Sequence, residues 1–172
     1  MLSNNLTSTL DLIPLMIDKG NGFRAFTEIV IPGEGEYSLS VTTGDKVAML
    51  YNRVISTDQP NIRYEVRTGA TTTITGDPIT IFPANPKLVK PTGAVIAPCS
   101  YSDAGTLNDI DLIPGQAASG SNKGGETFSP TEIKPITENS ETLIIFKNPN
   151  NQACNVLLYY KWFELGANAW AQ

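Results

Sequence analysis

The stretch from Ala153 to Glu164 constrains the fold more than any other part of the sequence, because it is apolar on both faces of an extended chain. Side chains alternate between the two faces of a strand, and a surface strand of a monomeric sandwich is expected to alternate apolar and polar residues. The sequence therefore predicts that this strand contacts a core on one side and a second subunit on the other. One face carries Cys154, Val156, Leu158, Tyr160 and Trp162. The other face carries Leu157, Tyr159 and Phe163, and its polar residues are Asn155 and Lys161.

Low charge and abundant turn residues favour an all-β protein. Charged residues make up 17% of the 172 residues, below the share of about a quarter in ordinary domains. The 14 glycines and 12 prolines supply turns between short strands. We therefore expect a single-domain β-sandwich, jelly-roll-like in character. The predicted strands cover residues 23–31, 36–43, 46–55, 62–67, 71–75, 79–82, 88–97, 106–113, 142–147 and 153–164.

The domain predicted for residues 23–165 is flanked by an N-terminal arm, residues 1–22, and a C-terminal tail, residues 166–172. The arm contains several large aliphatic residues, but Pro14 interrupts them, and proline inside a helix removes a backbone hydrogen bond. We therefore expect an extended arm that ends at a glycine-rich turn, residues 20–22. Residues 115–125 are rich in glycine and serine and are expected to form a surface loop.

The residue content argues against an enzyme. The chain has no histidine, which removes the commonest general base and the commonest metal ligand. Glu34 and Glu36 resemble a carboxylate pair, but a polar turn after Pro32 and Gly33 is the simpler interpretation. The acids near residue 108 lack the spacing of an EF-hand, so we expect loop carboxylates in solvent and neither a metal nor a cofactor. This second group comprises Asp103, Asn108, Asp109 and Asp111.

Several other classes of partner are excluded by composition. The net charge is −5 and no cluster of Lys and Arg occurs, so nucleic-acid binding is not expected. No apolar run approaches about 18 residues, so no membrane span is expected.

The first five residues lack the pattern of a secretory signal, which predicts synthesis in a reducing cytoplasm. Cys99 and Cys154 are then expected to be small core residues rather than a disulfide.

The aromatic residues near the C-terminus have two possible roles. Tyr159, Tyr160, Trp162 and Phe163 could stack on sugars, but residues in a continuous apolar strand more often belong to a core or a subunit interface. Trp170 lies in a tail of small residues. It could dock into a neighbouring molecule or fold back on its own domain.

The order of several segments resembles a widespread group of small virion proteins of tailed bacteriophages, over about residues 23–165. The segments are Ile62–Gly69, Ile81–Asn85, Asn108–Asp111, Leu143–Asn148 and Asn155–Glu164. The best-understood relatives of this kind are head decoration (cement) proteins, which are β-rich, often trimeric and placed on the outside of the capsid. The resemblance implies a non-enzymatic protein of the virion, with no catalytic residue.

We therefore expect a capsid decoration protein, a homotrimer that also binds the major capsid protein or other virion proteins. An arm or a tail would grip the shell, and deletion of residues 1–20 would leave a folded domain that no longer binds capsids. Two alternatives stay open: a protein of the tail, neck or fibre base, and a module that binds host surface glycans. The predicted interface residues are Leu12, Ile13, Leu15, Leu157, Tyr159, Phe163 and Trp170.

Overall fold

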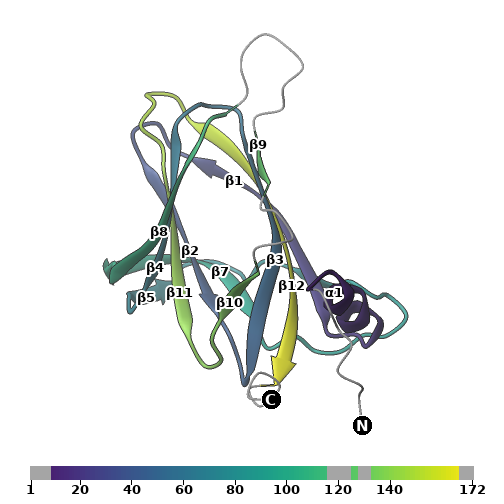
Figure 1. Ribbon diagram of the computed structural model, residues 1–172. Coiled ribbons are helices and arrows are strands. Elements are labelled where there is room, and N and C mark those ends of the chain that lie inside the picture. The colour runs from purple at the N-terminus through teal and green to yellow at the C-terminus, as the bar shows by residue number, and fades with distance from the viewer. Residues whose placement is uncertain (1–8, 116–124, 128–132, 167–172) are drawn as a thin grey trace.

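Two antiparallel β-sheets packed face to face form the protein in the computed structural model, which describes residues 9–115, 125–127 and 133–166 (Figure 1). Sheet A contains, in spatial order, β10 (Lys134–Ile136), β3 (Lys46–Thr57), β12 (Cys154–Gly166), β1 (Gly22–Ile31) and β6 (Ile81–Pro83), and β9 (Gly125–Thr127) also pairs with β3. Sheet B contains β5 (Thr71–Ile74), β7 (Val95–Asp103), β2 (Glu36–Thr42), β11 (Glu141–Lys147), β4 (Ile62–Thr68) and β8 (Thr106–Ile113).

The chain crosses repeatedly from one sheet to the other, and this confirms the predicted all-β sandwich. β1 and β3 lie in sheet A, β2 and β4 lie in sheet B, and the last two strands again divide between the sheets. Consecutive strands from β1 to β4, and also β11 and β12, therefore lie in opposite sheets. Alternating side chains then place one apolar row from each strand between the sheets.

The main core lies between the sheets and is continuous across them. Ile31 and Leu39, which flank the turn from sheet A to sheet B, are fully buried, as is Phe146 of β11. The rings of Phe23 and Trp162 lie 5.9 Å apart between centroids. This packing explains why the even-numbered residues of β12, from Cys154 to Trp162, are all buried.

Helix α1 (Thr9–Asp18) replaces the extended arm expected for this region. The prediction was wrong because Pro14 removes only one backbone hydrogen bond, and burial of the apolar side of the helix offsets that loss. Met16 is buried in a cluster with Met49 and Phe163 on the outer face of sheet A. The helix ends at Asp18, and Gly20, whose φ is 74°, forms the left-handed C-terminal cap through its N–H, which donates to the Ile17 carbonyl.

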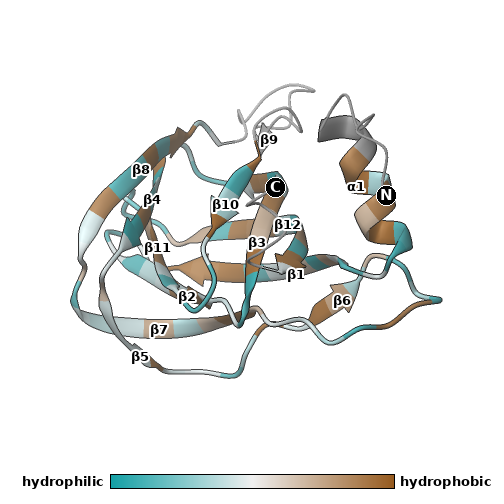
Figure 2. Ribbon diagram, turned by 60° about the horizontal axis from the view of Figure 1, so that its bottom comes forward, coloured by the Kyte–Doolittle hydropathy of each residue, from teal (hydrophilic) through white to brown (hydrophobic). Residues whose placement is uncertain are grey.

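The two-faced character of β12 is explained in part within one chain. Phe163 is fully buried and its ring stacks on Tyr51, with 6.0 Å between ring centroids. Figure 2 shows α1 beside this end of β12, on the side of sheet A away from sheet B. Phe163 is therefore covered by its own helix, which corrects its predicted role in a subunit interface.

Strand β7 begins at Val95, seven residues later than the strand predicted from residue 88. The carboxylate of Glu164, which is 3% exposed, accepts hydrogen bonds from the backbone N–H groups of Gly93 (3.0 Å) and Ala94 (3.2 Å). It also accepts one from the Thr92 hydroxyl. These bonds hold the segment before β7 in a non-strand conformation.

Both cysteines are free and buried, as predicted. Cys154 lies in the main core, and Cys99 lies in a smaller cluster with Leu143 and Ile145 on the other side of sheet B. Burial raises the pKa of the Cys154 thiol to about 11 and also raises the pKa of Cys99. Both side chains therefore act as small apolar core residues.

Candidate functional site

The outer face of sheet A carries a group of apolar side chains that α1 does not cover. We call this group the β1–β12 patch. Phe26 is 56% exposed, Phe82 is 47% exposed and Leu157 is 41% exposed, whereas Val54 and Tyr159 are partly exposed. Scattered apolar residues are normal on a protein surface, but contiguous ones mark a contact surface.

Strand register brings the patch together from four strands. Phe26 of β1 lies opposite Tyr159 of β12, and Tyr159 lies opposite Val54 of β3. Phe82 enters from β6, where it lies opposite Arg24. Because residues directly opposite each other in a sheet are in side-chain contact, the patch is a continuous surface rather than separate side chains.

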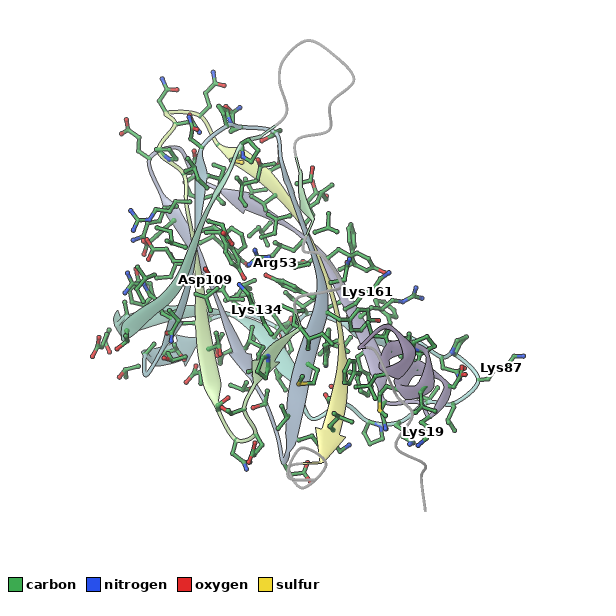
Figure 3. All side chains as sticks on the ribbon, viewed as in Figure 1. Lys19, Arg53, Lys87, Asp109, Lys134 and Lys161 are labelled. Carbon is green, nitrogen blue, oxygen red and sulfur yellow. The ribbon has the colours of Figure 1, made fainter. Side chains whose placement is uncertain are left out.

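The patch forms a shallow groove of about 470 Å³. Arg24 lines the groove, and the Lys161 ammonium lies 5.1 Å from the centroid of the Tyr159 ring. Figure 3 shows Lys161 on the side of sheet A that faces away from sheet B. The surface therefore combines aromatic rings with two cations, on a chain whose net charge is −5.

The residues of the groove suit binding. Arg24, Phe26, Val54, Ser56, Phe82, Leu157 and Tyr159 line it, and this set contains no carboxylate or histidine to act as a base. In the parts of the chain that the structure describes, no group of three potential metal-ligating residues occurs. The arrangement can hold a partner by apolar contact, ring stacking and charge.

Two of the four residues near position 108 differ from the solvent-exposed loop carboxylates that we expected, whereas Asp103 and Asn108 are exposed. Asp109 and Asp111 lie on β8, where Asp109 forms an ion pair with Lys134 and Asp111 forms one with Arg53. The hydrogen bond from Lys134 holds the pKa of the Asp109 carboxyl below its ordinary value. These acids connect sheet B to sheet A.

The predicted interface residues fall into three groups. Leu157 and Tyr159 lie in the β1–β12 patch. Leu12, Ile13 and Leu15 lie on α1 and pack, partly buried, against the cluster around Phe163. They contact their own domain and stay partly exposed, so their predicted role in an interface stays a prediction. Trp170 lies outside the described residues.

Sequence reasoning missed Phe26, Val54 and Phe82. The alternation in residues 23–31 was a usable signal for Phe26, because Phe23, Ala25 and Ile29 share the opposite face. Phe82 joins the patch only through the pairing of β6 with β1, which the sequence does not indicate.

The four aromatic residues considered for sugar binding do not form a row on one exposed face of β12. Tyr160 and Trp162 are buried between the sheets and Phe163 is buried under α1. Tyr159 is the member of that group that reaches the surface groove.

Comparison with known protein families, curated proteins and solved structures finds no match for this chain. Among the described residues, no helix has the length and apolar character needed to cross a membrane.

Proposed function

We propose that this protein is a non-enzymatic structural protein of a bacteriophage virion that assembles as a homo-oligomer through the β1–β12 patch. The observation that carries the proposal is the contiguous exposure of Phe26, Phe82 and Leu157 around Tyr159. Leaving such a surface in water costs about 25 cal/mol per Å² of apolar area relative to burying it. Aromatic residues on rigid strands lose little conformational entropy when they bind, so they suit the centre of an interface.

Strand pairing supports a jelly-roll topology. We infer it because the chain pairs from its ends inward: β1 with β12, β2 with β11, β3 with β10 and β4 with β8. Successive pairs alternate between sheet A and sheet B, as when a long hairpin is rolled into two layers. Jelly rolls are frequent in viral shells, although the fold alone fixes no function.

The place of this protein in the virion is proposed from the resemblance of residues 23–165 to phage virion proteins. The outside of the head, on the major capsid protein, is the position that we propose, and the tail or neck is the alternative. Many copies on a lattice would make weak single contacts effective.

Chemical labelling tests the proposed interface directly. Both native cysteines are buried, so Leu157→Cys introduces an accessible thiol into the patch. The matched control is Leu112→Cys, at a 63% exposed position on β8 of sheet B. We expect maleimide to modify the patch thiol slowly at high protein concentration and rapidly on dilution, and the control thiol rapidly at both. Equal and rapid labelling of both thiols at every concentration would contradict the proposed interface.

The virion setting needs a separate test. Particles of the source phage made without this protein are expected to release DNA at a lower temperature, and purified wild-type protein should restore their resistance. Phe26→Ser protein should not restore it. Particles whose stability and composition do not depend on the protein would contradict a structural role in the virion.

A further inference from the structure

A cavity of about 870 Å³ lies between the two sheets, separate from the β1–β12 patch. Its walls come from β3, β10 and β12 of sheet A and from β2, β4, β7, β8 and β11 of sheet B. This volume falls in the range of roughly 300–1,000 Å³ that small-molecule sites occupy. The cavity is therefore large enough for a ligand, not only for a few water molecules.

The greater part of the cavity wall is apolar. Leu50 and Trp162 line it from sheet A, Ile96 and Ile144 line it from sheet B, and Ile136 lies on the edge strand β10. An apolar wall favours the hydrocarbon or aromatic body of a ligand, because transfer of such a body from water is favourable.

Charged groups in the cavity are paired across the sheets. The Arg53 guanidinium, 2% exposed as a residue, donates to Asp111 at 2.6 Å and lies 4.5 Å above the Tyr64 ring. Lys134 pairs with Asp109. Figure 3 shows Arg53, Asp109 and Lys134 directed into the space between the sheets. The carboxylate of Glu141, which also lines the cavity, accepts hydrogen bonds from the Ser40 and Thr72 hydroxyls. Each of these charged side chains therefore already has a partner, and a charged ligand would find no free counter-charge among them.

The Tyr160 hydroxyl is a buried polar group in the wall of the cavity. Tyr160 is 6% exposed and lines the cavity beside Arg53, which lies opposite it in the sheet. Its hydroxyl lies beside the Tyr64 side chain but makes no hydrogen bond of normal geometry among the described residues. Burial raises the pKa of this phenol well above its ordinary value, and nearby Tyr64 adds to the rise. The hydroxyl is therefore neutral and can donate or accept one hydrogen bond.

We propose that the cavity binds a neutral amphipathic small molecule, with an apolar body against Trp162 and Ile144 and a hydroxyl or carbonyl group at the Tyr160 hydroxyl. A buried polar group without a partner is costly, and a ligand oxygen would satisfy it. A free carboxylate or ammonium group would have to be buried without a counter-charge, which is more costly still.

Fluorescence titration of the full chain tests the site. The chain has two tryptophans, so Trp170→Phe leaves Trp162 in the cavity wall as the only one. N-phenyl-1-naphthylamine, a neutral probe, is expected to bind at one site per chain and to quench Trp162. We expect 1-decanol to displace the probe. Decanoate and decylammonium should bind at least about tenfold more weakly than 1-decanol, which corresponds to roughly 1.4 kcal/mol. Absence of saturable binding, or equal displacement by all three, would overturn the proposal.

A conservative pair of variants isolates the hydroxyl. Tyr160→Phe should weaken the binding of 1-decanol by about three- to tenfold, the value of one hydrogen bond. It should leave the unfolding midpoint unchanged. Tyr101→Phe makes the same chemical change on β7 of sheet B, outside both the cavity lining and the patch, and should leave 1-decanol binding unchanged. Equal affinities for 1-decanol in both variants would overturn the role of Tyr160.

A second pair locates the probe. Ile136→Trp is expected to fill the cavity from β10 and abolish probe binding. Ile110→Trp, at a 47% exposed residue of β8 outside the cavity lining, should not affect it. Probe binding that survives Ile136→Trp in the folded protein would place the probe elsewhere, including the β1–β12 patch, and would overturn the proposal without affecting the proposed function.

Discussion

Glu65 is a fully buried carboxylate that stays charged because three cations surround it. Its oxygens lie 2.7 Å from Arg63 Nε, 2.8 Å from Arg67 Nε and 3.0 Å from Lys147 Nζ. Burial opposes the charged form, but hydrogen bonds from Arg67 and Lys147 and the charges of Lys147 and Arg63 outweigh it. The pKa of Glu65 is therefore lowered from its ordinary value of 4.5.

This lowered pKa predicts the acid limb of the stability curve. Because the folded protein holds Glu65 ionised more strongly than the unfolded chain does, its stabilisation is complete above about pH 4.5 and is lost as pH falls through the folded pKa. Glu65→Gln should lower the free energy of unfolding by about 1–3 kcal/mol at neutral pH, and the variant should lose less stability than the wild type as pH falls. Urea unfolding between about pH 3 and 7 measures both. Parallel loss of stability in the wild type and the variant would contradict the assignment.

Two odd-numbered residues of β12 are expected to contribute differently to the stability of the fold. Phe163 is fully buried under α1, whereas Leu157 is 41% exposed in the patch. Phe163→Ala should lower the free energy of unfolding by about 3–5 kcal/mol, and Leu157→Ala should change it by less than about 0.5 kcal/mol. Denaturant unfolding of dilute protein, below any self-association, makes the comparison. A similar cost for both variants would show that this face of β12 is not divided as described.

At the scale of elements, α1 is part of the folded domain rather than a detachable arm. It covers Val47, Met49 and Phe163 on sheet A. Deletion of residues 1–20 is therefore expected to expose these side chains and to cost at least about 3 kcal/mol, instead of leaving the domain intact. Circular dichroism melting of the truncated protein measures the loss. An unchanged melting temperature would contradict the packing of α1.

The local sequence pattern was sufficient to predict the strands in which apolar and polar residues alternate clearly. Residues 62–67 alternate apolar and charged residues, and β4 forms there with Glu65 and both arginines on one face. The same reasoning failed at Pro14, where tertiary burial outweighed local propensity. It also missed β10, because Lys134, Pro135 and Ile136 are too few to show a period and include a proline.

The candidate site was only partly predictable for a related reason. Leu157 and Tyr159 were found because they interrupt the expected polar face of a strand. Phe163 was assigned to the same surface, since nothing local shows that α1 covers one half of that face. Phe82 and Val54 reach the patch through pairings between strands far apart in sequence.

At the scale of the whole molecule, the sandwich has two separate features that differ in kind. The patch on the outside of sheet A is open and flanked by cations, and suits a protein surface. The cavity between the sheets is lined by paired charges and apolar residues, and suits a small neutral molecule. Loss of either feature by mutation should leave the other intact, because different strand faces form them.

Self-association through the β1–β12 patch is the central claim, and the molar mass in solution tests it most directly. Light scattering of the wild-type protein is expected to give a multiple of 18.5 kDa, with three times that value for the homotrimer expected from the sequence. Phe26→Ser should give 18.5 kDa, and Leu112→Ser, on the other sheet, should leave the mass of the oligomer unchanged. A wild-type protein that remains at 18.5 kDa at all concentrations would contradict the account.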